Sequence, residues 1–143
     1  MDLGLAGRVC VITGGSRGIG LETARMLRAE DAKVLLVARD AGQLADAAEG
    51  LDGGDEEVAT LPLDVTEPDS ARELHDLLGD ERFDLLVLNA GMGHPRGQTV
   101  ATAPDETIVR LFQTNAIGPV RTAEILLDLV TPKTGVIAYI TSR

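Results

Sequence analysis

Apolar residues are grouped along this chain in blocks of two kinds, which predict two kinds of element. Five short runs are almost entirely apolar and rich in Val, Ile and Leu, which is typical of strands buried on both faces. They are Val9–Thr13, Lys33–Ala38, Val58–Leu63, Leu85–Asn89 and Val136–Thr141. Longer segments between most of these runs repeat apolar residues with helical spacing. They are Ile19–Glu30, Ala41–Leu51, Asp69–Leu78 and Pro104–Val130.

This alternation of strand and helix predicts an α/β fold. Strands that are apolar throughout are typical of a parallel sheet with helices on both faces. Right-handed crossovers then favour a doubly wound, Rossmann-like sheet, and we expect about five strands in the order 3-2-1-4-5. The sequence has no internal repeat and no interdomain linker, so residues 1–143 are expected to form a single domain.

Local signals predict several helix boundaries. Asp40 can cap the second helix, and Thr66 with the Glu-Pro-Asp segment after it indicates the start of the third. Gly118 and Pro119 lie in the middle of the long last helix, where we expect a bend or a break.

Charge and composition narrow the classes of partner. The chain has 143 residues, 44% of them hydrophobic, and a formal net charge of −10. This acidity argues against nucleic acid or an anionic membrane surface as a partner. No apolar run is long enough to cross a membrane, and the N-terminus does not resemble a signal peptide, so a cytoplasmic location is expected. Cys10 is interpreted as a small core residue, because a single cysteine cannot form an internal disulfide.

The turn after the first strand carries the clearest chemical signal. Gly14, Gly18 and Gly20 follow the strand Val9–Thr13 directly, and a helical pattern starts within the turn. Such glycines let the backbone curl tightly and approach a bulky anion, while the helix points unpaired N–H groups and its positive end at that anion. In this strand–turn–helix context the spacing predicts a site for the pyrophosphate of a dinucleotide. A turn that binds no ligand is the alternative interpretation.

The end of the second strand indicates which dinucleotide to expect. Ala38 stands where an NAD-specific site usually places a carboxylate for the ribose 2′-hydroxyl, and Arg39 follows it. Arg39 and Arg17 can both meet a 2′-phosphate, which favours NADP over NAD. The alternative is that they are two solvent-exposed arginines beside a loop.

Two other strand ends carry polar and small residues that suit a nucleotide. Asp64 follows the third strand, where its carboxylate can accept a hydrogen bond from an adenine amino group while Val65 packs on the ring. Asn89 ends the fourth strand, where it can bond to neighbouring backbone, and the small Ala90 and Gly91 let a ribose lie close. Taken alone, either segment also fits an ordinary strand-end turn.

Asn115 is unusual inside the predicted long helix, because its side-chain amide competes with the helical backbone for hydrogen bonds. A water-holding or helix-kinking role near a catalytic centre would explain this residue.

Together these motifs resemble the short-chain dehydrogenase/reductase family over residues 5–143. The resemblance rests on TGGSRGIG at 13–20, DV at 64–65, NAG at 89–91, Asn115 and GVIAYITS at 135–142, in the family's order and close to its spacing. It implies hydride transfer between NADPH and a carbonyl or alcohol substrate, and catalytic roles for Asn115 and Ser142. The residues expected to hold the cofactor are Gly14, Ser16, Arg17, Gly18, Ile19, Gly20, Arg39, Asp64, Val65, Asn89, Ala90 and Gly91.

The chain departs from the family pattern in two places. Leu88 stands where many members carry a first Asn, which is a minor change. The family's acid/base Tyr, and a Lys four residues after it, should follow Ser142 by about a dozen residues, but the sequence ends at Arg143. Tyr139 and Arg143 have the Tyr-x-x-x-basic spacing, yet four residues of a strand span roughly 13 Å, which is too far for the cation to activate the phenol. We therefore expect the chain as given to be inactive and to lack the family's last strands.

These observations leave three functions open. The leading one is an NADP-dependent oxidoreductase represented by its cofactor-binding part. The others are a non-catalytic dinucleotide-binding module, which could serve as a dimerising scaffold, and a truncated product with neither role. The last apolar strand would form an exposed edge, so we expect either a further C-terminal segment or a homo-oligomer. His75 and His94 are isolated in the sequence, and no metal site is expected.

Overall fold

The computed structural model describes residues 3–51, 56–93 and 95–141. Within them, five parallel strands form one sheet in the order β3-β2-β1-β4-β5. The strands are β1 Val9–Thr13, β2 Lys33–Ala38, β3 Val58–Pro62, β4 Leu85–Leu88 and β5 Val136–Tyr139. The predicted fold class, strand order and parallel pairing are confirmed.

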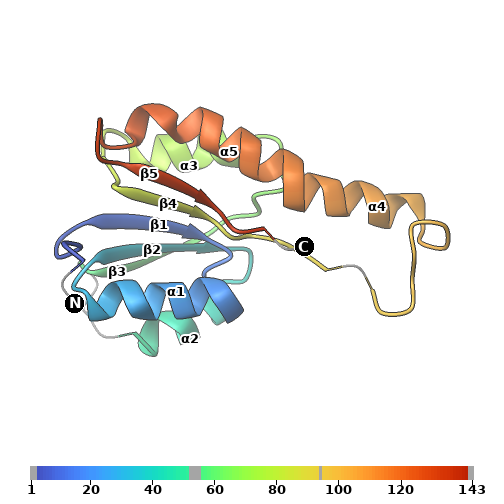
Figure 1. Ribbon diagram of the computed structural model, residues 1–143, viewed down its shortest axis with the longest axis horizontal. Coiled ribbons are helices and arrows are strands. Elements are labelled where there is room, and N and C mark those ends of the chain that lie inside the picture. The colour runs from blue at the N-terminus through green and yellow to red at the C-terminus, as the bar shows by residue number, and fades with distance from the viewer. Residues whose placement is uncertain (1–2, 52–55, 94, 142–143) are drawn as a thin grey trace.

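Helices cover both faces of this sheet (Figure 1). The helical elements are α1 Gly18–Ala29, α2 Ala41–Glu49, α3 Ser70–Leu78, α4 Asp105–Phe112, the π-helical segment η1 Gln113–Ile117, α5 Gly118–Leu126 and the 3₁₀ segment η2 Leu127–Leu129. Cys10, Ile12 and Leu36 point to the side of α1 and α2, where they pack with residues of those helices. Val11, Val37 and Leu86 point to the side of α3 and α5. The inner strands β1, β2 and β4 are almost entirely apolar because both of their faces are largely buried, whereas the edge strands β3 and β5 are more exposed.

Three of the predicted strands extend past their observed carboxyl ends. β3 ends at Pro62, one residue before the predicted Leu63. Asn89 follows β4 instead of ending it, because its backbone N–H donates to the Thr13 side chain. Thr141 lies beyond β5, which ends at Tyr139. The prediction for Asp40 is confirmed, since its carboxylate accepts a hydrogen bond from the Gln43 backbone N–H and caps α2.

The long last helix does not break at Gly118 and Pro119. Instead, helical backbone continues through these residues, and the irregularity is the π-helical segment just before them. Pro119 has no N–H to donate to the Asn115 carbonyl four residues earlier, and a wider turn accommodates that loss. The Gly118 N–H donates to the Gln113 carbonyl, five residues back, and a Cβ on Gly118 would lie 3.0 Å from the Val65 carbonyl oxygen. The irregularity expected at Gly118 and Pro119 therefore lies up to one turn earlier, in the segment that contains Asn115.

At the amino edge of the sheet, Asp84, which precedes β4, connects to β1 through an ion pair and a hydrogen bond. Its carboxylate lies 3.0 Å from the Arg8 guanidinium and accepts a hydrogen bond from the Val9 N–H, also at 3.0 Å. Desolvation raises the pKa of Asp84, but hydrogen bonds from Val9, Thr131 and Arg8 outweigh it, and the pKa lies below its usual value. In the adjacent core, burial raises the pKa of the Cys10 thiol to about 11, with a smaller contribution from the charge of Asp84.

Apolar side chains remain exposed on β5 and along the long helix. β5 is an edge strand in the sheet, and the side chains of Val136 and Tyr139 are about half exposed. Helix α4 projects beyond the sheet (Figure 1), has no fully buried residue, and leaves Phe112 63% exposed. Among the described helices, none has the length and apolar character needed to cross a membrane.

Candidate functional site

The glycine-rich turn lies at the carboxyl end of β1 and opens directly onto the N-terminus of α1. Arg17 occupies the cap position, and among the described residues no side chain caps the helix and no acidic residue lies in its first turn. Gly18 has a φ of +56°, and a Cβ built there would meet no atom within 4 Å. The turn therefore presents backbone N–H groups and a positive helix end toward open space, as an anion site requires.

Thr13 and Asn89 lock this turn to the end of β4. The Thr13 hydroxyl accepts hydrogen bonds from the Asn89 and Ala90 backbone N–H groups, both at 3.1 Å, and donates to the Val87 carbonyl at 3.4 Å. The Asn89 side-chain amide donates to the Gly14 carbonyl at 3.0 Å. The sequence predicted that Asn89 bonds to neighbouring backbone, and the contact with Gly14 confirms it. The bridging role of Thr13 was not predicted, although a hydroxyl at the end of a buried strand is a usable signal.

Asn115 holds the loop that follows β4. Its side-chain oxygen accepts a hydrogen bond from the Met92 N–H at 2.9 Å, and its side-chain nitrogen donates to the Met92 carbonyl at 2.8 Å. Asn115 lies within the π-helical segment, so the expected irregularity in the helix is present at this residue. Both ends of the amide are engaged with backbone, which makes Asn115 an anchor between the long helix and the loop at 89–93.

Asp64 and Val65 lie in the turn after β3. The Asp64 carboxylate accepts hydrogen bonds at one oxygen from the Thr66 N–H at 2.9 Å and from the Thr66 hydroxyl at 2.7 Å. A carboxylate can accept about four hydrogen bonds, so Thr66 fixes its orientation and leaves acceptor positions on the other oxygen. The side chain of Val65 is half-buried, and its backbone carbonyl lies beside Gly118 of the long helix.

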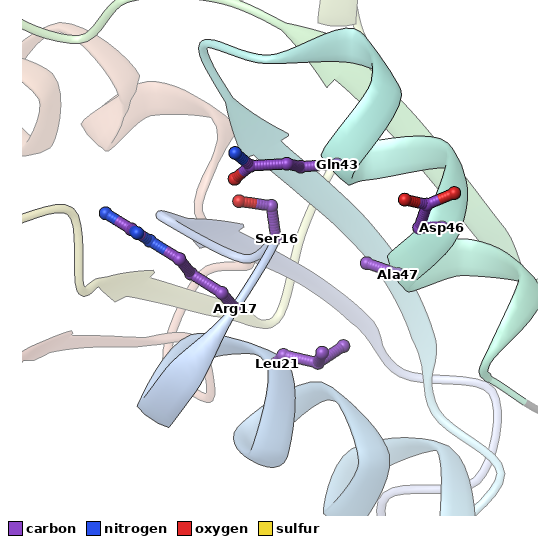
Figure 2. A pocket seen from close by; sticks show the side chains of 6 residues that line it. All are labelled: Ser16, Arg17, Leu21, Gln43, Asp46 and Ala47. Atoms are coloured by element: carbon purple, nitrogen blue, oxygen red, sulfur yellow. The ribbon is translucent and has the colours of Figure 1, made fainter.

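Both arginines proposed for a 2′-phosphate are exposed on the same edge of the sheet. Arg17 lies at the start of α1, and Arg39 lies between the end of β2 and the cap of α2. Among the described residues, neither arginine forms an ion pair. Beside Arg17, a shallow hollow of about 280 Å³ separates the glycine-rich turn from α2 (Figure 2). Ser16, Leu21, Gln43, Asp46 and Ala47 line it together with Arg17.

Other predicted residues are not brought together in this way. Ser142 and Arg143 lie outside the described residues. Tyr139 belongs to strand β5, as the sequence predicted. Within the described part of the chain, no group of three or more His, Cys, Asp or Glu side chains could hold a metal ion. The sequence did not predict Gln43, which lines the hollow, or Met92, which binds Asn115, as residues of the site.

Solved structures of known proteins share this fold. A solved carbonyl reductase from Pseudomonas aeruginosa, in complex with NADP, superimposes with a TM-score of 0.83 at 36% identity, over 94% of this chain and 61% of that chain. L-Sorbose reductase from Gluconobacter frateurii, complexed with NADPH and L-sorbose, gives a TM-score of 0.85 at 32% identity, over 97% of this chain and 54% of that chain.

Curated relatives match over most of this chain but over only about half of their own length. The rhamnolipid-biosynthesis 3-oxoacyl-[acyl-carrier-protein] reductase of Pseudomonas aeruginosa is 36% identical over 129 residues, which are 88% of this chain and 49% of that protein. The fatty acyl-CoA reductase of Acinetobacter baylyi is 30% identical over 139 residues, which are 95% of this chain and 47% of that protein. The short chain dehydrogenase family model matches residues 8–143, so this chain belongs to the short-chain dehydrogenase/reductase family.

Proposed function

We propose that this chain carries the cofactor-binding part of an NADP-dependent oxidoreductase. The observation that supports it best is the glycine-rich turn at the carboxyl edge of a parallel sheet. This turn opens onto the N-terminus of α1, which no side chain of the described part of the chain caps. Residues 64–65 after β3 and residues 89–91 after β4 lie at the same edge and belong to other segments that match the family pattern. The 143 residues are proposed to act as one domain.

The preference for NADP over NAD follows from charge at the end of β2. Ala38 supplies no carboxylate for a ribose 2′-hydroxyl, whereas Arg17 and Arg39 can neutralise a 2′-phosphate. An exposed Asp40 lies next to Arg39, but its carboxylate is engaged at the N-terminus of α2. NADP or NADPH complexes of similar solved structures are consistent with this assignment.

Each candidate residue then has a defined task. When bound, the cofactor supplies or accepts the hydride. The N–H groups at the start of α1 would bind its pyrophosphate, and Asp64 and Val65 would orient its adenine. Asn89 shapes the backbone on which its ribose would lie. Asn115 would support a proton relay by holding the loop at 89–93 and the irregular helix in place, and Ser142 would hold the substrate oxygen.

Catalysis by these 143 residues alone is not expected. The sequence contains no match to the family's acid/base Tyr and Lys after Ser142, so proton transfer to the substrate oxygen would lack its donor. The substrate class, a carbonyl or alcohol compound, is therefore proposed for the enzyme to which this half corresponds. A cytoplasmic location stays a prediction from the sequence, and fractionation of the source cells would test it.

A second candidate function is a dinucleotide-binding module that dimerises without catalysis. It is favoured by the exposed apolar side chains along the long helix, among them Phe112, Val120 and Leu127, each about 60% exposed. A homo-oligomer formed through this helix would bury them. Sedimentation of the purified chain would distinguish a concentration-dependent dimer from a monomer.

The cofactor assignment is tested by titrating the chain with NADPH and NADH. Binding is followed by the intrinsic fluorescence of the reduced nicotinamide. We expect NADPH to bind about tenfold or more tightly than NADH, and the double variant Arg17→Ala, Arg39→Ala to remove that preference. The double variant Arg72→Ala, Arg110→Ala, which removes two exposed arginines from α3 and α4, is the matched control and should retain it. Absence of binding by both cofactors would overturn the proposal.

A further inference from the structure

The hollow beside the glycine-rich turn is polar at one end and apolar along its floor. Figure 2 shows the Gln43 amide lying near the Ser16 hydroxyl at the end from which the Arg17 side chain extends. Leu21 of α1 and Ala47 of α2 form the apolar part. Hydrogen-bond donors are therefore gathered at one end of the hollow.

Charge restricts where an anion can lie in this hollow. Asp46 lines it one helical turn beyond Gln43, and its carboxylate repels a phosphate from that end. At the other end, Arg17 attracts a phosphate, and Arg39 lies at the adjoining end of β2. An anion held by these arginines would therefore meet the Ser16 and Gln43 side chains rather than Asp46.

Gln43 is fixed in position by the cap of α2. Its backbone N–H donates to the Asp40 carboxylate at 2.9 Å, so the first turn of the helix is held in register with the end of β2. Only the exposed side chain remains to contact a ligand. A substitution at this position leaves the backbone N–H in place, so the capped helix is expected to fold unchanged.

We propose that Gln43 is a further specificity residue for the cofactor, donating a hydrogen bond from its side-chain amide to the 2′-phosphate of NADP. This inference rests on the proposed function. Because the amide is neutral, it contributes a directional hydrogen bond and no net attraction, unlike Arg17 and Arg39. One exposed hydrogen bond of this kind changes affinity by about two- to tenfold.

The test is a charge series at position 43, measured with NADPH and NADH. We expect Gln43→Ala to weaken NADPH binding about two- to tenfold and Gln43→Glu to weaken it further, whereas Gln43→Lys strengthens it. NADH affinity should stay within about twofold in all three variants, because NADH has no 2′-phosphate. Increasing salt should reduce the effect of the Lys and Glu variants much more than that of the Ala variant.

Position 45 supplies the matched control. Ala45 is exposed on the same helix, two residues on and therefore on another face, so Ala45→Glu and Ala45→Lys place the same charges away from the hollow. These variants should leave the NADPH-to-NADH affinity ratio unchanged. Titration with adenosine 2′,5′-bisphosphate and with 5′-AMP repeats the comparison without the nicotinamide half of the cofactor.

The possible failures are distinguishable. If Arg17→Ala and Arg39→Ala lower the affinity ratio but the position 43 series does not, the inference about Gln43 is wrong and the proposed function stands. If the position 45 variants shift the ratio as much as the position 43 variants, the effect is long-range charge and the inference is also wrong. If the unaltered chain binds neither NADPH nor NADH, both proposals are overturned.

Discussion

Gly20 is the residue of the turn at which a single added methyl group should do most damage. A Cβ at this position would lie 2.3 Å from the Gly14 carbonyl oxygen and 2.5 Å from the side-chain nitrogen of Asn89. Those two atoms are hydrogen-bonded to each other and connect the glycine turn to the end of β4. Gly20→Ala therefore forces α1 away from the turn or breaks this connection.

The size of the effect follows from three contributions. Relief of the contact requires a shift of roughly 1 Å in backbone, and overpacking of this kind costs about 1–3 kcal/mol. Loss of the Asn89–Gly14 hydrogen bond adds about 1 kcal/mol. Alanine is a better helix former than glycine, which offsets about 0.5–1 kcal/mol. We therefore expect Gly20→Ala to lower the free energy of unfolding by about 1–3.5 kcal/mol.

Urea unfolding followed by far-ultraviolet circular dichroism measures this difference. Gly42→Ala is the matched control, because it adds the same methyl group in α2, where the nearest atom is an Asp40 side-chain oxygen at 3.3 Å. It should change the free energy of unfolding by less than about 1 kcal/mol. NADPH titration of the folded Gly20→Ala variant, in buffer without urea, should show weaker binding because the turn has moved. Equal stability of the two variants, with unchanged NADPH affinity, would refute the reasoning.

Three further outcomes follow from other contacts. Thr13→Val removes the shared acceptor for the N–H groups of residues 89 and 90 and should cost about 2–4 kcal/mol in urea unfolding, while Thr13→Ser should restore most of it. Cys10, fully buried with a pKa of about 11, should not react with a thiol reagent at neutral pH until guanidinium unfolds the chain, so rapid labelling of the native state would contradict the core placement. The pKa values of Asp84 and of Asp128, to which His75 is hydrogen-bonded, are lowered from 3.8 in the folded chain. Both carboxylates therefore stabilise the folded chain at pH values above 3.8, and this stabilisation is lost as the pH falls through their pKa values in the folded chain. Asp84→Asn should reduce the dependence of the unfolding free energy on pH in the acidic range. The same pH dependence in the variant as in the unaltered chain would show that Asp84 contributes nothing to it.

The order of strands and helices was predictable from the sequence because a strand that is buried on both faces must consist almost entirely of apolar residues. A strand such as Val9–Thr13 must be apolar at nearly every position when helices pack on either side, so it is visible without any alignment. The cap of α2 was predictable for a similar reason, since Asp40 acts on a backbone N–H three residues away. Both signals involve residues that are close together in the sequence, so they can be recognised from one sequence alone.

The contacts within the candidate site were less predictable because many of them join a side chain to distant backbone. Asn115 binds both the N–H and the carbonyl of Met92, 23 residues earlier, and any residue other than proline would offer the same two groups. No sequence pattern at position 92 therefore predicts the contact with Asn115. The bend expected at Gly118 and Pro119 was misplaced, because the missing N–H of Pro119 affects the carbonyl of Asn115, four residues earlier, and not the proline itself.

The candidate residues differ in what their side chains already do, and this determines how their variants must be measured. Asn89, Asn115 and Asp64 hold backbone in place through hydrogen bonds within the chain, so their removal alters the geometry of the turn and loops before any ligand is added. Arg17 and Arg39 extend into solvent without an ion pair among the described residues, so their removal should change ligand affinity and leave the unfolding free energy nearly constant. A loss of NADPH binding in an asparagine variant is therefore informative only beside its unfolding free energy. The same loss in an arginine variant, at unchanged stability, reports directly on the phosphate.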